Sequence, residues 1–260
     1  LVKSLQYSQE NSIFMHVDTE GNAPSLKYKV HEVYASLSDS EYDLICITET
    51  WLDEAVNSAE LFPSTYQVFR GDRNHEATGR KRGEGVLLGI KNELVVSRIN
   101  LPSRQTSNLI DLVACKISFH PEDLYIFVVY IPPDISVGDY EHFTDSFGNY
   151  IHNFLRVLLI GDFNAPNFVS LVQDSKSQHL HNMASFLDLS QFKHITNFKN
   201  GCLDLIFSNV SDCIVQYDKQ SIVKEDRFHP SLKVTLSLKQ NYCTKFSIKM
   251  SFCQTQKVQT

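Results

Sequence analysis

Six polar side chains stand at the ends of strand-like apolar runs, where a sheet could bring them together. Four of them follow such a run and two precede one: Glu49, Tyr130, Asp162, Asn164, Asp204 and His229. In a sheet with antiparallel neighbours, one rim collects the ends of some strands and the starts of others. Carboxylates, a carboxamide, a phenol and an imidazole on one rim suit the metal-assisted hydrolysis of a phosphate ester.

Each of these residues taken alone has a simpler explanation. A carboxylate at a strand end is more often a turn or cap residue, and a tyrosine there usually packs against its neighbours. A single histidine before a proline, as in His229-Pro230, is usually a surface residue or a satisfied core residue. The prediction of a site therefore depends on several such residues occurring in chain order.

The elements that would position these residues are short strands interleaved with a few helices. Strand-like runs, bounded by turn formers, cover residues 43–48, 85–90, 111–119, 124–131, 157–160, 203–207 and 231–238. Apolar residues recur at helical spacing over residues 26–37, 143–154 and 180–187. This mixture predicts packed mixed sheets with helices outside them, in one domain.

The composition excludes several classes of protein. The 260 residues include 24 lysines and arginines and 30 acidic residues, which gives a formal charge of −6, and 42% of the residues are hydrophobic. These values exclude a disordered chain, a collagen and a coiled coil. The negative charge argues against a protein that coats nucleic acid by bulk attraction, but it allows a local basic patch.

The densest basic cluster lies in and beside the polar segment 71–84. It consists of Arg70, Arg73, Arg80, Lys81 and Arg82. Two interpretations of this cluster are equally supported, a solvated surface loop and a contact with the phosphates of DNA.

Other features of the chain bear on its location and its ends. No apolar run reaches the roughly 18 residues of a membrane-spanning helix, and the six cysteines lack the C-x2-C spacing of a zinc site. Without a secretory segment, the protein is expected to be nuclear or cytoplasmic and not secreted. The chain has no initiator Met and is expected to be a fragment. Residues 239–260, rich in Gln, Lys and Thr, are expected to form a linker or a partly disordered tail.

Two motifs place the strand-end residues in a recognisable setting. Thr48-Glu49-Thr50-Trp51-Leu52 and Gly161-Asp162-Phe163-Asn164-Ala165-Pro166, in this order, form a specific signal. Three further parts of the chain agree with them: Asn22-Ala23-Pro24-Ser25-Leu26-Lys27, Tyr130-Ile131-Pro132-Pro133, and Leu203-Asp204-Leu205-Ile206-Phe207 followed by Asp226 and His229-Pro230-Ser231-Leu232. Together they resemble the endonuclease/exonuclease/phosphatase superfamily, the fold of DNase I and apurinic endonucleases. Within it, they resemble the endonuclease domain of non-LTR (LINE-type) retrotransposons.

The resemblance spans about residues 13–238, which we expect to form the domain. It implies a DNase I-like four-layered α/β sandwich, with two packed mixed β-sheets and outer helices. It also implies a phosphodiesterase that depends on Mg²⁺, with Mn²⁺ as the alternative cation, and that nicks DNA at retrotransposon target sites. No membrane partner is implied. A reverse transcriptase domain is expected in the full-length element but is not encoded in this sequence.

The resemblance also implies a role for each site residue. Glu49 would be the principal metal ligand, with Asn22 nearby and Asp226 assisting a second metal position. Asp162 would orient or deprotonate the attacking water, and Asn164 would hold the water and the phosphate through its amide donors.

The remaining residues would bind the phosphate. Tyr130 would donate to the phosphate or to the departing oxygen. A protonated His229 would bind a non-bridging oxygen, while Asp204 accepts from the other ring nitrogen.

Departures from the family pattern keep two alternatives open. Pro24 stands where the family usually has Arg, Glu84 stands where a third Gly is usual, and two residues separate Asp226 from His229. Pro24 and the separation of Asp226 from His229 favour a catalytically inactive relic that keeps the fold and acts, if at all, as a binding module. The other alternative is a hydrolase of the same fold that acts on phosphoinositides or sphingolipids, which the retrotransposon-like Glu-Thr-Trp-Leu and Tyr-x-Pro-Pro blocks disfavour.

Overall fold

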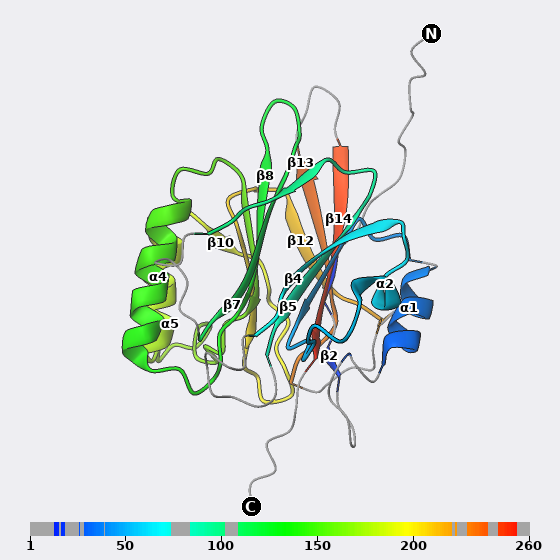
Figure 1. Ribbon diagram of the computed structural model, residues 1–260. Helices are drawn as coiled ribbons and strands as arrows, with labels where there is room; N and C mark the ends of the chain where they lie inside the picture. Colours follow the sequence, from blue (N-terminus) through cyan, green and yellow to red (C-terminus); the bar gives the residue numbers. More distant parts are fainter. Residues whose placement is uncertain are drawn as a thin grey trace, which may run out of the picture.

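The computed structural model consists of two packed β-sheets between two pairs of helices (Figure 1). It describes residues 13–15, 17–18, 26, 29–38, 40–73, 84–101, 109–219, 222, 228–238 and 244–253. The helices are α1 (Val30–Ser38), α2 (Ser58–Leu61), α4 (Val137–Ile151) and α5 (Ser175–Phe186). No helix in these ranges is both long enough and apolar enough to cross a membrane.

The first sheet has six strands in the order β12-β13-β1-β3-β14-β2, and β14 also pairs with β13. Its strands are β1 (Ile13–Met15), β2 (Val17–Asp18), β3 (Leu44–Thr48), β12 (Cys213–Tyr217), β13 (Leu232–Leu238) and β14 (Thr244–Cys253). The antiparallel pair β4 (Tyr66–Gly71) and β5 (Val86–Lys91) lies beside β3. Backbone hydrogen bonds join the two ends of β3 to β5, from Lys91 N to Asp43 O at 2.8 Å and from Thr50 N to Gly85 O at 3.2 Å.

The second sheet has the order β10-β11-β9-β8-β7-β6. Its strands are β6 (Val96–Arg98), β7 (Asp111–Ile117), β8 (Leu124–Tyr130), β9 (Val157–Asp162), β10 (Ser190–Gln191) and β11 (Asp204–Ser208). Only β8 and β9 run parallel in this sheet, and helix α4 makes the crossover between them. A parallel pair needs such a connection, because a tight turn cannot return the chain to the same end of the sheet.

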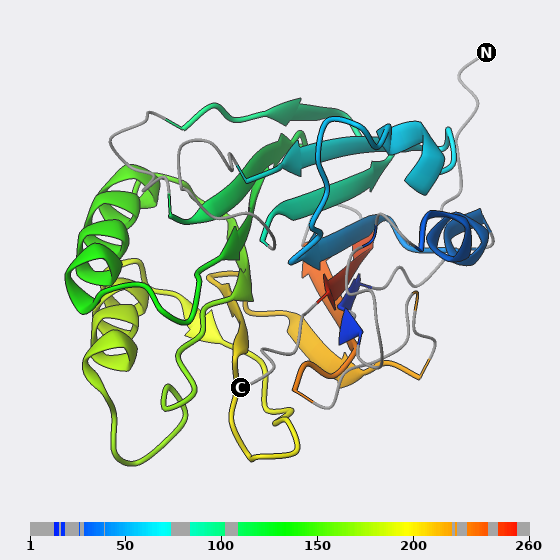
Figure 2. The same cartoon turned by 60° about the horizontal axis from the view of Figure 1, so that its bottom comes forward.

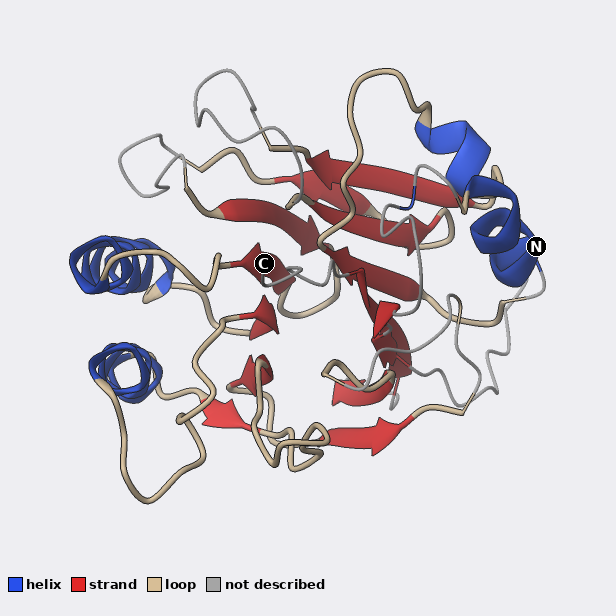
Figure 3. Ribbon diagram, turned by 90° about the horizontal axis from the view of Figure 1, so that it is seen from below, coloured by secondary structure: helices blue, strands red, loops and turns tan. Residues whose placement is uncertain are grey.

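Alternation of side chains along the strands builds four layers. In β8, Ile126 and Val128 face the core between the sheets, whereas Phe127 and Val129 pack under α4 and α5. The residues of β3 also alternate, and face in turn the central core and the layer of α1 and α2. Figures 2 and 3 show the two helix pairs on opposite sides of the sheets. The expected four-layered α/β sandwich is therefore confirmed.

The structure differs from the expected tail at the C-terminus. Residues 244–253 form β14, which pairs in parallel with β3 and antiparallel with β13. Apolar residues stand at every second position of this segment, at Phe246, Ile248, Met250 and Phe252. This period of two is typical of a strand, and the expectation of a tail overlooked it. Residues 239–243 and 254–260 lie outside the described residues.

Candidate active site

Three neighbouring strands bring three of the predicted site residues into one row. Across the sheet, Asp162 at the end of β9 is the register partner of Tyr130 at the end of β8 and of Asp204 at the start of β11. Strand β8 runs parallel to β9 and contributes its last residue, whereas β11 runs antiparallel to β9 and contributes its first residue. The expected meeting of strand ends and strand starts at one rim therefore occurs in the second sheet.

Gly161 allows this row to form. A Cβ atom at Gly161 would overlap the backbone of Val129 on the adjacent strand, with its closest contact to the carbonyl oxygen. Any side chain at this position would push β8 and β9 apart and break the register that aligns Tyr130 with Asp162. The close packing of β9 against β8 therefore requires the glycine of the Gly-Asp-Phe-Asn motif.

Asn164 holds the Asp162 carboxylate in place. Its backbone N donates to Asp162 Oδ1 and its Nδ2 donates to Asp162 Oδ2, both at 3.0 Å, while Nδ2 also donates to the Ile131 carbonyl at 2.8 Å. Both amide hydrogens are therefore engaged within the protein. This arrangement supports a role for Asn164 in orienting Asp162, rather than the expected binding of phosphate through the amide donors.

Asp204 lies between two buried cations. Its Oδ1 accepts from His229 Nδ1 at 2.7 Å and its Oδ2 accepts from Lys193 Nζ at 3.2 Å. Each of the three side chains is at most 1% exposed. Lys193 was not predicted, and the sequence around it contains no motif that would single it out.

Electrostatics favours a charged imidazole here. Burial disfavours the protonated ring of His229, but the Asp204, Asp162 and Glu49 carboxylates outweigh it and raise the pKa of His229 to about 9. For Asp162, burial is the largest effect and raises the pKa of the carboxyl group, although His229 opposes it. The pKa of Asp204 is lowered, because His229 and Lys193 outweigh its burial.

Glu49 approaches this row from the first sheet. It follows β3, is 6% exposed and has a left-handed φ of 53°. The Tyr130 hydroxyl donates to its carboxylate, while burial and the nearby Asp162 raise the pKa of Glu49 well above its ordinary value. Its Oε2 has no hydrogen-bond partner among the described residues. A buried carboxylate oxygen without a donor has the character expected of a cation ligand.

Backbone strain is concentrated around these residues. Besides Glu49, the residues Trp51, Glu84 and Asn164 have left-handed φ values of 53°, 78° and 46°. Such conformations are unfavourable outside glycine and persist where the surrounding structure imposes them, often at functional sites. Glu84 stands where the family resemblance predicts glycine, and its φ of 78° is one that glycine adopts more readily than glutamate.

A second charged cluster, of Arg73, Glu84 and Asp111, adjoins the first. Arg73 Nε donates to Asp111 Oδ1 at 2.7 Å, its Nη1 forms an ion pair with Glu84 at 3.1 Å, and the residue is 5% exposed. Its guanidinium group faces carboxylates rather than solvent, so the DNA contacts proposed below do not include it. Arg70 is paired with Asp72 at 2.6 Å and donates to the carbonyls of Val56 and Asp53. Arg80, Lys81 and Arg82 lie outside the described residues, as do Asn22 and Asp226.

The linked buried charges do not balance. The carboxylates are Glu49, Glu84, Asp111, Asp162 and Asp204, and the cations are Arg73, Lys193 and His229. Among the residues that the structure describes, and with every group ionised, the cluster thus holds five negative and three positive groups. An excess of buried carboxylates favours a divalent cation, and hard oxygen ligands suit Mg²⁺.

Two groups of side chains could bind a cation, and their hydrogen bonds distinguish between them. Ligand atoms of Asp162, Asp204 and His229 lie within 4.8 Å of one another, which is close enough to share an ion. However, Asp204 already uses both oxygens on His229 and Lys193, so these residues form a hydrogen-bond network. Glu49 fits a metal better, because its Oε2 is buried and has no donor among the described residues.

The free energy of unfolding is expected to fall as the pH rises from about 6.5 to about 9. The folded protein holds the His229 proton more tightly than the unfolded chain, so this contribution is fully present below pH 6.5 and disappears near the folded pKa. The shift corresponds to about 3 kcal/mol. Urea titrations across this pH range would measure it, and His229→Gln should remove the difference. If the free energy of unfolding changes with pH in the same way in the unmodified and the His229→Gln proteins, the Asp204–His229 ion pair is contradicted.

Comparison with known proteins gives a consistent result. The sequence matches the endonuclease/exonuclease/phosphatase family over residues 15–216. No curated protein matches it. Among solved structures, the endonuclease domain of TRAS1, a telomere-specific non-LTR retrotransposon, superposes with a TM-score of 0.63 at 14% identity, covering 88% of this chain and 98% of that chain.

Two further structures share the fold. The 3′-5′ exonuclease NExo from Neisseria meningitidis has a TM-score of 0.60 at 15% identity, covering 86% of this chain and 98% of that chain. D. rerio TDP2, solved with a single-strand DNA product, has a TM-score of 0.55 at 12% identity, covering 87% of this chain and 98% of that chain. At these identities the likeness establishes the architecture.

Proposed function

Because the chain belongs to the endonuclease/exonuclease/phosphatase family, we propose that it is a Mg²⁺-dependent endonuclease that nicks DNA at retrotransposon target sites. The observation that carries the proposal is a buried Glu49 oxygen that has no donor among the described residues, beside the Tyr130–Asp162–Asp204 row. DNA as the substrate is supported by the similar structure of D. rerio TDP2, which was solved with a single-strand DNA product.

Attack by water on a phosphodiester must overcome charge repulsion and a poor leaving group. When bound, a divalent cation neutralises charge on the phosphoryl oxygens and on the departing 3′ oxygen. Glu49 would hold it, and Asn22 and Asp226 are the other proposed ligands. Mn²⁺ would serve in the same position, because it shares the preference for hard oxygen donors.

Asp162 is the proposed base for the attacking water. Its raised pKa makes it a better proton acceptor than an exposed aspartate, and Asn164 fixes the direction of both carboxylate oxygens. The nearby positive charge of His229 helps to keep Asp162 ionised near neutral pH.

His229 and Tyr130 are the proposed phosphate-binding groups. Asp204 accepts the Nδ1 proton of His229, which directs Nε2 as a donor to a non-bridging phosphate oxygen. The Tyr130 hydroxyl donates to Glu49 in this structure and would also donate to the phosphate or to the departing oxygen. The raised pKa of Tyr130, caused first by burial, keeps it a donor at any working pH.

The purified protein is expected to convert supercoiled plasmid to nicked circles in the presence of Mg²⁺, and EDTA should stop the reaction. Agarose gel electrophoresis measures this conversion. Asp188→Asn, an exposed change on the surface, should nick like the unmodified protein. A folded protein that does not nick with Mg²⁺ or Mn²⁺ would contradict the proposal and favour the inactive relic. Hydrolysis of phosphoinositides without nicking would favour the lipid-phosphate alternative.

Arg80→Ala/Arg82→Ala is expected to weaken DNA binding and to reduce the slope of log K against log salt by about 2, because two phosphate contacts are lost. Fluorescence anisotropy at several salt concentrations measures both effects. Lys116→Ala/Arg156→Ala is a matched control, since these side chains pair with Asp123 and Glu122 at the other end of β7 and β8. Equal slopes for the two double variants would exclude the basic-loop contact.

A further inference from the structure

A buried lysine lies beside the row of candidate site residues. Lys193 follows β10 by two residues, and its side chain is 1% exposed. Phe192 N donates to Ile206 O at 2.9 Å, which continues the pairing with β11 past the last residue of β10. Gln191 Nε2 donates to Lys193 O at 2.6 Å. The backbone therefore holds Lys193 against the strand that begins with Asp204.

The burial of this positive charge needs an explanation. A lysine is almost never fully buried unless it is paired, because its ammonium group loses its hydration. Asp204 is the partner, with its Oδ2 3.2 Å from Lys193 Nζ. A buried ion pair of this kind often gives no more stability than two apolar side chains of the same volume. A role in the site therefore explains Lys193 better than the stability of the fold does.

The ion pair fixes the orientation of the Asp204 carboxylate. Oδ1 accepts from His229 Nδ1 at 2.7 Å, while Oδ2 accepts from Lys193. A carboxylate with a charged donor on each oxygen cannot rotate without breaking a charge-assisted hydrogen bond. The direction of the His229 ring depends in turn on Oδ1, because Nδ1 is bonded to it. Lys193 can therefore orient the imidazole through Asp204.

The charge of Lys193 also acts on the other carboxylate of the row. Burial is the largest effect on the pKa of Asp162 and raises it, whereas the charges of His229 and Lys193 lower it. His229 and Lys193 also outweigh burial at Asp204 and lower its pKa. Cys202 is a further titratable group near Lys193, but burial raises the pKa of its thiol, which stays neutral. Lys193 and His229 together thus balance the two carboxylates.

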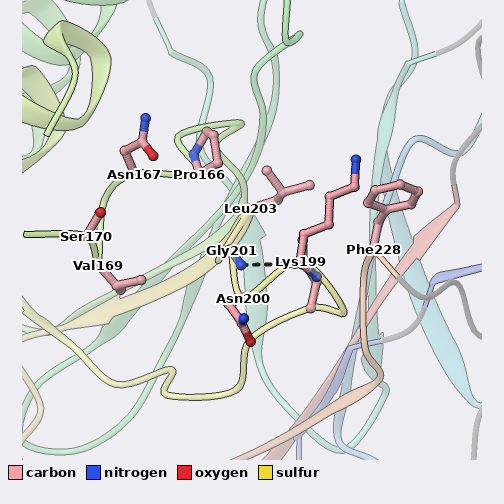
Figure 4. Close-up of a pocket in the computed structure, with 10 residues that line it drawn as sticks. Pro166, Asn167, Val169, Ser170, Lys199, Asn200, Gly201, Leu203 and Phe228 are labelled. Carbon is pink, nitrogen blue, oxygen red and sulfur yellow. Dashed lines mark hydrogen bonds between the residues drawn. The ribbon is translucent and has the colours of Figure 1, made fainter. Parts of the chain in front are cut away.

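Lys193 is placed to act on these side chains and not on the substrate. A pocket of about 380 Å³ lies next to the row, and its lining includes Leu203, which precedes Asp204 (Figure 4). Lys199 and Asn200, from the same segment between β10 and β11, also line this pocket. Lys193 is not among its lining residues, and its 1% exposure keeps Nζ away from solvent.

We propose that Lys193 is a positioning residue for the hydrolysis, and that its ammonium group holds Asp204 in the orientation that presents His229 Nε2 to the phosphate. This inference rests on the proposed function and adds to it a residue that lies outside the sequence motifs. Lys193 makes and breaks no bond with the substrate. Its contribution is a fixed positive charge and one hydrogen bond in the interior of the protein.

Lys193→Met tests this role, because methionine fills a similar volume without a charge or a donor. Single-turnover nicking of a labelled duplex with Mg²⁺, at several protein concentrations, separates the maximal rate from the affinity. The maximal rate should fall about 10- to 100-fold, as is typical when an outer-shell hydrogen-bond partner is removed. The half-saturating concentration should stay within about twofold, because no substrate contact is lost. Lys116→Met is the matched control, since Lys116 pairs with Asp123 at the other end of β7 and β8.

Lys193→Met/Asp204→Asn tests the route through Asp204. If Lys193 acts through Asp204, the double variant should nick as fast as Asp204→Asn alone, because the two effects are not additive. It should also resist urea better than either single variant, since neither charge of the ion pair is left without its partner. This comparison decides the matter even if Lys193→Met alone does not fold. A further loss of about tenfold in the double variant would overturn the inference.

Proton NMR measures the hold on Asp204 without any catalysis. The Nδ1 proton of His229, bonded to Asp204, should give a downfield signal that His229→Gln removes. This signal should broaden or move upfield in Lys193→Met and stay unchanged in Lys116→Met. An unchanged signal or an unchanged maximal rate in Lys193→Met would overturn the inference. If the unmodified protein does not nick DNA, the proposed nuclease fails, and the NMR signal still decides whether Lys193 positions Asp204.

Discussion

Glu49→Gln is expected to reduce Mg²⁺-dependent nicking by about 10³-fold and to abolish the stabilisation of the fold by Mg²⁺. The substitution keeps the size of the side chain but removes the charge of the proposed metal ligand, whose Oε2 lacks a donor among the described residues. Plasmid nicking measures the first effect. The increase of Tm with Mg²⁺ concentration measures the second, independently of catalysis.

The same substitution should raise the Tm of the metal-free protein. Burial and the neighbouring Asp162 already raise the pKa of Glu49, which means that its ionised form is unfavourable in the metal-free fold. A neutral glutamine removes this repulsion. A rise in Tm together with a loss of activity would show that the carboxylate is kept for function at the expense of stability.

Glu54→Gln provides the control, because Glu54 is exposed and belongs to the same loop after β3. It should change neither the nicking rate nor the response to Mg²⁺. If Glu49→Gln protein still nicks and is still stabilised by Mg²⁺, then Glu49 is not the ligand, and the Asp162, Asp204 and His229 group becomes the better candidate for the cation.

Asp204→Asn is expected to lower nicking by about 10² to 10³-fold and to destabilise the fold by about 3–5 kcal/mol. Asp204 accepts from both His229 and Lys193 in a site that excludes water, so its loss leaves two buried cations without their counter-ion. Both groups would then tend to lose their protons. His229 would fail to bind phosphate as a cation, and the ionised form of Asp162 would lose a neighbouring positive charge.

Urea unfolding and plasmid nicking measure these effects on the same preparation. Asp188→Asn is the matched control, because Asp188 is exposed and its φ of 52° is one that asparagine tolerates well. The pH dependence of the free energy of unfolding tests the ion pair independently of catalysis. This free energy should no longer decline between pH 6.5 and 9 in the Asp204→Asn protein. Near-normal stability for Asp204→Asn would contradict the buried ion pairs.

The strands of the second sheet show how much the sequence could predict. Strands β7, β8, β9 and β11 lie within one residue of the expected starts, because their apolar runs end at recognisable turn and polar residues. Side-chain alternation then dictates which residues share a face. The convergence of Tyr130, Asp162 and Asp204 follows from strand ends and starts alone, and the register confirms it.

Short edge strands were not predicted. The apolar pattern did not indicate β6 and β10, which have three and two residues. A strand of two or three residues is too short to show a period, and its backbone pairing depends on a neighbour that is remote in sequence. Ser190–Gln191 is extended because β11 lies beside it.

The sequence by itself determined the layers, the rim and the identity of the groups on it, because periodicity and motif spacing are properties of neighbouring residues. Only the tertiary structure decided the partners of the buried charges. Arg73, expected at a DNA surface, is enclosed by Glu84 and Asp111, and Lys193 is paired with Asp204. A charged side chain is stable in the interior only when an opposite charge arrives from another part of the chain, so its burial cannot be predicted from its own surroundings in sequence.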